Sequence, residues 1–136
     1  MELKHISAQP IQIAKLLEEA HNPEAGAVVL FSGEARNNHE GNFVDYLEYE
    51  AQIEMAEKKI EGIIKEAKAR WDLKIAVAIH RVGKVKISDT AVVVITASAH
   101  REEAYEANRF IIDEIKSKAP IWKKEFLTDG RSIWQN

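Results

Sequence analysis

The feature that most constrains the fold is an amphipathic segment in the middle of the chain. Its apolar residues recur at steps of three and four, with lysine and glutamate at most positions between them: Ile53, Ala56, Ile60, Ile63, Ile64, Ala67 and Trp71. This spacing gathers the apolar side chains into one stripe along a helix. We therefore predict a helix over 53–71 that packs this stripe against a sheet.

Four other segments have the pattern of strands. Ala25–Ser32 is a continuous apolar run, which is typical of a strand buried on both faces. Apolar and acidic residues alternate over Leu47–Ala51, at the spacing of a half-exposed strand. Ile75–Val82 and Ala91–Ala99 are apolar strands linked by Gly83–Asp89. The helix over 53–71 therefore has several candidate strands to cover.

A second long helix is predicted over Arg101–Ser117. Glu102 and Glu103 lie in its first turn and lysines lie in its last, so charges of the right sign oppose the helix dipole at both ends. Pro120 blocks continuation of the helix because proline restricts the residue before it. The segment that follows, Ile121–Leu127, is predicted to be an edge strand.

Shorter elements complete the pattern. Leu3–Ser7 has the composition of a short strand, and Pro10–Ala20 predicts a short amphipathic helix. Residues Asn37–Asn42 form a polar loop, and Arg131–Trp134 predicts a last short strand. Strands and helices mixed in this order indicate the α+β class, with helices packed on a mixed sheet.

Composition limits the chemistry that this chain can perform. Its 136 residues, 46% of them hydrophobic, suit one compact domain over 1–136. The net charge of -3 is spread along the chain, which argues against binding to long nucleic acids. The complete lack of cysteine excludes disulfides, thiolate zinc sites, iron–sulfur ligation and a persulfide-carrying nucleophile. No apolar run is long enough to span a bilayer and no leader pattern begins the chain, so we expect a cytoplasmic protein.

Cations and an imidazole gather at the ends of the helix predicted over Arg101–Ser117. His100 and Arg101 open this helix, Lys116 lies in its last turn, and Lys123 and Lys124 follow on the next strand. Side chains of this kind at loop and helix ends can hold a small anion.

Each of these residues also has a simpler interpretation. Lys116 can merely compensate the helix dipole, and Lys123 and Lys124 can protect a strand edge from pairing. His100 can cap the helix, and Arg101 can be a solvated residue of its first turn. Further along the sequence, Arg36 can be an ordinary surface residue. His80 and Arg81 can form a second catalytic pair or anchor the turn at Val82-Gly83, and the turn is the preferred interpretation.

The arrangement of several motifs is more specific than any residue alone. From Gly26 to Trp134 the sequence resembles the large, catalytic subunit of molybdopterin synthase. The motifs that carry the resemblance are Gly26-Ala27-Val28-Val29, Phe31-Ser32-Gly33 leading to Arg36-Asn37, Leu47-Glu48-Tyr49-Glu50, His80-Arg81-Val82-Gly83, Ser98-Ala99-His100-Arg101, and Lys116-Ser117-Lys118-Ala119-Pro120-Ile121-Trp122-Lys123-Lys124-Glu125.

The resemblance implies a fold, a reaction and a partner. The fold is α/β-hammerhead-like, with helices on a mixed, largely antiparallel sheet and a small extra β subdomain. The reaction is sulfur transfer that converts cyclic pyranopterin monophosphate to molybdopterin. The sulfur arrives as a thiocarboxylate on the C-terminal glycine of a small ubiquitin-like carrier that ends in Gly-Gly. This explains how a sulfurtransferase can lack cysteine, and no cofactor or metal is expected.

The resemblance also implies the site residues. Lys116 and Lys123 are the expected catalytic residues, beside the incoming thiocarboxylate. The expected substrate-binding residues are Glu34, Ala35, Arg36, His100, Arg101, Lys116, Lys123, Lys124 and Glu125. Arginine presents a planar fork of donors to phosphate, histidine can donate or shuttle a proton, and lysine can exchange protons or stabilise an oxyanion. Strand alternation does not decide which of Lys123 and Lys124 faces the pocket, and we choose Lys123 from the resemblance.

Helix length adds an expectation about assembly. Arg101 and Lys116 are fifteen positions apart on one helix, which is roughly 22 Å along the axis. One small pterin cannot easily touch both. We therefore expect a homodimer in which His100 and Arg101 of one subunit complete the pocket of the other, and a heterotetramer with two carriers.

Other classes of function remain open at this stage. A non-catalytic phosphate- or pterin-binding regulatory module would use the same basic residues without a protein partner. Nucleic-acid binding predicts a steep salt dependence and exposed stacking aromatics, which the acidic balance disfavours. A metal enzyme is disfavoured because the five histidines include no HExxH or comparable spacing. No membrane partner is expected.

Overall fold

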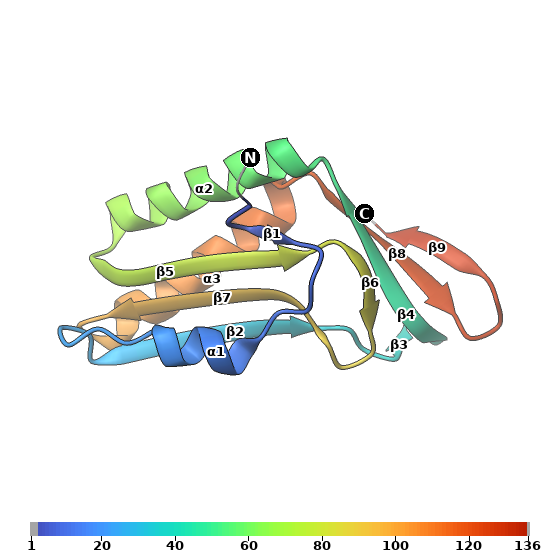
Figure 1. The fold of residues 1–136 in the computed structure, drawn as a ribbon, viewed down its shortest axis with the longest axis horizontal. Coiled ribbons are helices and arrows are strands. Elements are labelled where there is room, and N and C mark those ends of the chain that lie inside the picture. Colours follow the sequence, from blue (N-terminus) through green and yellow to red (C-terminus); the bar gives the residue numbers. More distant parts are fainter. Residues whose placement is uncertain (1–2, 136) are drawn as a thin grey trace.

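The computed structural model describes residues 3–135 and contains two sheets (Figure 1). The first sheet has four strands in the spatial order β1, β5, β7, β2. Their bounds are β1 Ile6–Ser7, β5 Leu73–Arg81, β7 Thr90–Ser98 and β2 Ala27–Glu34. β1 runs parallel to β5, and the other neighbouring pairs are antiparallel. The predicted mixed, largely antiparallel sheet is confirmed.

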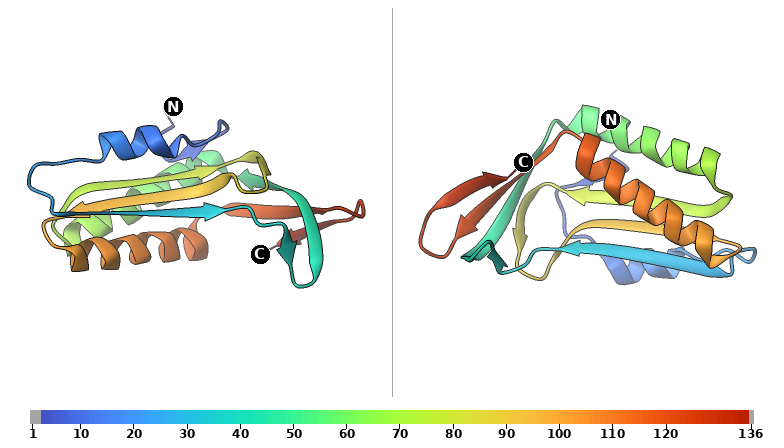
Figure 2. Two further views of the ribbon diagram at one scale, coloured as in Figure 1. Left: turned by 90° about the horizontal axis from the view of Figure 1, so that it is seen from below. Right: turned by 180° about the vertical axis from the view of Figure 1, so that it is seen from behind.

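The helices lie on opposite faces of this sheet. The short helix α1 (Ile13–Glu19) covers one face, and α2 (Ile53–Arg70) and α3 (Arg101–Lys118) lie side by side on the other (Figure 2). Both long helices occupy the segments that hydrophobic periodicity predicts. The α+β class is therefore confirmed.

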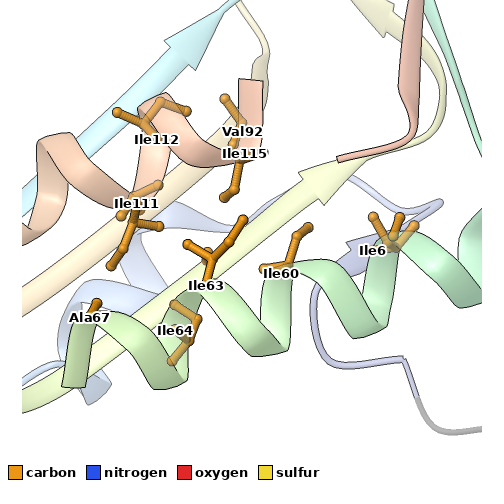
Figure 3. Packing of buried hydrophobic residues seen from close by; sticks show 12 residues of the cluster. Ile6, Ile60, Ile63, Ile64, Ala67, Val92, Ile111, Ile112 and Ile115 are labelled. Atoms are coloured by element: carbon orange, nitrogen blue, oxygen red, sulfur yellow. The ribbon is translucent and has the colours of Figure 1, made fainter. Parts of the chain in front are cut away.

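The main core lies between the two long helices and the sheet. Five of the seven residues in the predicted stripe of α2 are buried, and Ile60 and Ile63 join Ile111 and Ile115 of α3 in one cluster (Figure 3). Ile53, at the first turn of α2, remains 40% exposed. Burial of such side chains is the main favourable term in folding.

The second sheet lies at one end of the first, beyond the C-terminal end of β5 (Figure 1). It has five strands: β3, β4, β8 and β9 in spatial order, with β6 paired to β4. Their bounds are β3 Asn38–His39, β4 Asn42–Ala51, β6 Gly83–Lys86, β8 Ile121–Leu127 and β9 Ser132–Gln135. This sheet corresponds to the small extra β subdomain that the resemblance implies.

Two strand environments differ from the prediction. β8 is not an edge strand, because it pairs with β4 on one side and with β9 on the other. Its lysines therefore do not protect a free edge. β2 is not buried on both faces: it is itself an edge of the first sheet, and none of its residues is fully buried. In both cases the position depends on pairing between segments far apart in sequence.

Several element boundaries also differ from the prediction. The predicted loop 37–42 contains β3, and the predicted link 83–89 contains β6. At the N-terminal end of the described chain, the strand is limited to β1 and the helix begins only at Ile13. Short strands such as β3 and β6 owe their structure to the longer β4 beside them, so local composition carries little signal for them.

A buried carboxylate fixes β1 to α2. The two carboxylate oxygens of Glu57 accept hydrogen bonds from the backbone N–H groups of Lys4, His5 and Ile6, at 3.0, 2.7 and 2.6 Å. His80 and Val82 in turn donate their backbone N–H groups to carbonyl oxygens of this same N-terminal segment. The end of β5 is therefore positioned through Glu57.

None of the helices described over residues 3–135 combines the length and the apolar character needed to cross a membrane.

Candidate active site

A cavity of about 490 Å³ lies where the two sheets meet the C-terminal end of α3. It is lined by residues from both sheets and from this helix, and its cationic lining residues are Arg36, Lys116 and Lys123. Three cations lining the same cavity can hold an anionic group such as a phosphate.

Strand alternation and pairing decide which lysine of β8 lines the cavity. Lys123 is the pairing partner of Tyr49 in β4, and both side chains line the cavity. Lys124 points to the opposite face of the sheet, where its Nζ lies 5.2 Å from the ring centre of Phe126 and 5.1 Å from that of Trp134. Lys124 is therefore held by cation–π contacts outside the cavity.

The remaining predicted residues near Arg36 differ in their placement. Glu34, at the end of β2, lines the cavity. Ala35 is 3% exposed and packs in a separate apolar cluster with Val44 and Leu47, and it is not a lining residue. Its backbone N–H donates to the carbonyl oxygen of Asp89 at 3.1 Å. Ala35 thus anchors the segment that carries Arg36.

His100 and Arg101 do not line this cavity. They lie at the N-terminal end of α3 and are exposed, whereas Lys116 lies in the last turn of the same helix. The His100 side chain makes no capping hydrogen bond to the helix. Within one chain the structure therefore brings together Glu34, Arg36, Lys116, Lys123 and Glu125, and it leaves His100 and Arg101 at the other end of the helix.

Glu125 is a buried carboxylate side chain that lines the cavity. It is 3% exposed, and its carboxylate lies 3.0 Å from Nδ1 of His39 and accepts a hydrogen bond from Nε2 of Gln135 at 2.9 Å. These partners come from β3 and β9, on either side of the β4–β8 pair. A buried carboxylate must be paired or hydrogen-bonded to be stable, and Glu125 has hydrogen-bond partners here.

Two further lining residues, Tyr49 and His80, are absent from the predicted site. Burial, assisted by the charge of Glu125, raises the pKa of Tyr49 to about 12, so its phenol stays protonated at neutral pH. Tyr49 shares a strand face with Leu47 and Ala51, and this alternation is the sequence signal that could have indicated its inward position. From the sequence, the preferred interpretation of His80 is that it anchors a turn, which does not predict its position in the cavity lining.

The cavity beside the N-terminal segment fits a reaction site less well. This larger cavity of about 590 Å³ lies between the N-terminal segment, α1 and β5, but its lining lacks the cluster of three cations. Within residues 3–135, no group of three or more histidines and carboxylates is placed to hold a metal ion.

Comparison with known proteins identifies the family. The model of the family described as MoaE protein matches residues 6–118. A protein of Staphylococcus carnosus named molybdopterin synthase catalytic subunit is 45% identical over 130 residues, covering 96% of this chain and 87% of that protein.

Solved structures agree with this match. The crystal structure of molybdopterin synthase from Staphylococcus aureus has a TM-score of 0.91 and 44% identity, and the match covers 100% of this chain and 98% of that chain. A complex of subunits 1 and 2 of the molybdopterin-converting factor from Helicobacter pylori has the same fold, with a TM-score of 0.80, 22% identity, and coverage of 97% of this chain and 89% of that chain. The chain therefore belongs to the MoaE protein family, and nearly its whole length is similar to proteins named molybdopterin synthase catalytic subunit.

Proposed function

We propose that this chain is the sulfurtransferase subunit that converts cyclic pyranopterin monophosphate to molybdopterin, in the cytoplasm. The observation that carries the proposal is the cavity at the end of α3, which is lined by Arg36, Lys116 and Lys123. The chain that forms this cavity has no cysteine. The site can bind an anionic substrate and stabilise charge, but it cannot supply a sulfur nucleophile. The sulfur must therefore come from another molecule.

The roles of the cavity residues follow from their charge and position. Arg36 offers a fork of donors for the substrate phosphate. Lys123 lies inside the cavity, where it stabilises negative charge on the thiocarboxylate and on the oxyanion that develops during transfer. Lys116 is exposed at the cavity, so it can reach both the incoming carrier and the pterin and can exchange protons during addition and elimination.

A small protein with a flexible C-terminal Gly-Gly tail is the proposed sulfur donor. Glycine has no side chain, so such a tail can enter a narrow cavity with its thiocarboxylate exposed. The Helicobacter pylori structure of the same fold is a complex of two subunits of the molybdopterin-converting factor. This supports a two-protein enzyme, which we extend to this chain.

The exposed position of His100 and Arg101 supports a shared site in a homodimer. These residues lie at the opposite end of α3 from Lys116, and a second copy can bring them to the cavity of the first. In a two-fold dimer the exchange is reciprocal, which creates two equivalent cavities and allows two carriers to bind.

Mixed dimers test this shared site. At a pterin concentration well below saturation, Arg101→Ala and Lys116→Ala homodimers should both have little activity, whereas a heterodimer of the two variants contains one site with both native residues. Such a heterodimer should recover about half the activity of the native dimer. Differently tagged chains, refolded together and purified through both tags, allow the measurement. An inactive heterodimer would show that Arg101 and Lys116 act within the same subunit.

Reconstitution tests the reaction itself. The purified chain is mixed with a thiocarboxylated ubiquitin-like carrier and cyclic pyranopterin monophosphate, and the dithiolene product is measured. We expect product only when all three components are present. Pterin binding without product, using folded protein and a matched carrier, would instead favour a phosphate- or pterin-binding regulatory module.

A further inference from the structure

His80 is a cavity residue to which the proposed mechanism assigns no role. It lies near the end of β5 and is 8% exposed. Its backbone N–H donates to the carbonyl oxygen of His5 at 2.7 Å, and its ring packs edge-on against Tyr49 with 4.8 Å between ring centres. The backbone of His80 is therefore fixed by the N-terminal segment, and its ring is packed against β4.

The local hydrogen bond selects one tautomer of this ring. Nδ1 of His80 lies 2.7 Å from the carbonyl oxygen of Arg81. A carbonyl oxygen only accepts hydrogen bonds, so Nδ1 carries the proton. In the neutral imidazole Nε2 then has a lone pair that can accept a hydrogen bond.

The surroundings keep this ring neutral. Burial is the main cause that lowers the pKa of His80 to about 4, and the nearby charge of Lys116 acts in the same direction against the opposing Arg81 hydrogen bond. The other ionisable groups around the cavity are Glu34, Arg36, Tyr49, Lys123 and Glu125. Because the pKa is lowered, His80 gains a proton only as the pH falls towards 4. Near neutral pH it is a hydrogen-bond acceptor through Nε2.

The cavity wall offers charged acceptors in the carboxylates of Glu34 and Glu125, and a neutral one in Nε2 of His80. Arg36, Lys116 and Lys123 are donors, and the protonated Tyr49 phenol can also donate. The carboxylate of Glu125 already contacts His39 and Gln135. A pterin carries ring N–H and amino donors besides its phosphate, so its recognition requires an acceptor as well as cations. Nε2 of His80 is an uncharged, fixed acceptor in the same cavity.

We propose that His80 is a substrate-positioning residue whose Nε2 accepts a hydrogen bond from an N–H group of the pterin ring. This inference rests on the proposed function. The cations hold the phosphate and the reacting carbons, while His80 fixes the orientation of the ring system between them. A site built to pair with a substrate N–H discriminates strongly against analogues that lack it, because its buried acceptor is then left unpaired.

Binding of cyclic pyranopterin monophosphate without the carrier tests this role, because no reaction can then occur. Calorimetry compares the native full-length chain with His80→Phe, which keeps a ring but has no acceptor, and with His80→Gln, which restores an acceptor. We expect Kd to rise about tenfold in His80→Phe. In His80→Gln, Kd should return most of the way to the native value. Equal affinity of all three proteins would overturn the proposal.

A spectroscopic readout on the native chain is independent of whether the variants fold. With ¹⁵N-labelled histidine, Nε2 of His80 should show the signal of an unprotonated ring nitrogen from about pH 5 to 8, and pterin should shift it as expected for an acceptor. The carrier added without pterin should leave this signal in place. A signal that pterin leaves unchanged, or a shift caused by the carrier and not by the pterin, would contradict the proposal.

Turnover separates this inference from the function on which it rests. If the native chain produces dithiolene with its carrier while His80→Phe binds pterin normally, the His80 role is wrong and the reaction stands. If the native chain binds pterin through His80 but yields no dithiolene with a matched carrier, the sulfurtransferase function is wrong.

Discussion

Lys116→Ala is expected to lower turnover by about 10²- to 10⁴-fold while pterin affinity changes little. Lys116 lies in the last turn of α3 and lines the cavity beside Lys123 and His80. A group that moves protons during addition and elimination acts mainly in the transition state, so its loss lowers kcat. Single-turnover kinetics with thiocarboxylated carrier, together with pterin binding measured without carrier, separate the two effects.

Lys118→Ala provides a matched control on the same helical turn. Lys118 is also exposed, but its Nζ pairs with Glu114 at 2.7 Å and it is not a lining residue of the cavity. Its removal should leave turnover close to that of the native chain. By contrast, Arg101→Ala should mainly weaken binding, because the proposed arginine clamp would contact the phosphate in ground and transition states alike. A loss of pterin affinity with unchanged turnover in Lys116→Ala would contradict the catalytic assignment.

Glu57→Ala is expected to lower the free energy of unfolding by about 3 kcal/mol or more. The Glu57 carboxylate is 7% exposed and accepts three backbone N–H groups from residues 4–6. Its removal leaves these donors without their acceptor, including two in buried hydrogen bonds. Urea unfolding followed by circular dichroism gives the free energy, and amide exchange at His80 and Val82 reports whether β1 separates from β5.

Glu54→Ala is the control for this stability effect. Glu54 lies on the same helix, is 66% exposed in its side chain, and contacts only Lys58 at 3.8 Å among the salt bridges of residues 3–135. Such an exposed pair contributes little, so the change should stay within about 0.5 kcal/mol. If Glu57→Ala unfolds at the same urea concentration as Glu54→Ala, the carboxylate does not hold β1. Faster exchange at His80 would link this buried contact to the cavity.

Local patterns were sufficient to predict the long helices and the main strands. The apolar stripe over 53–71 repeats with the period of a helix, and acidic and basic residues mark the two ends of α3. These signals depend on neighbours three or four positions away, so the sequence contains them directly. The environment of β8 cannot be predicted from near neighbours, because its position between β4 and β9 depends on pairing with other segments of the chain.

The choice between Lys123 and Lys124 shows the same limit within the cavity. Alternation assigns these lysines to opposite faces of one strand, but it cannot say which face meets α3. Pairing with β4 and β9 settles this: Lys123 shares its face with Tyr49, and Lys124 contacts the rings of Phe126 and Trp134. His80 was not predicted as a site residue because its burial and tautomer depend on β1, β4 and the Arg81 carbonyl together.

By itself, the sequence determined the helices, the α+β class, the absence of a cysteine nucleophile, and the set of basic residues available for chemistry. Only the tertiary structure decided which of those residues share a cavity, which lysine of β8 faces it, and that His80 and Tyr49 line it as well. The physical reason is range. Periodicity and composition act between near neighbours in the chain, whereas a cavity is formed by side chains that meet only after two sheets and a helix have packed together.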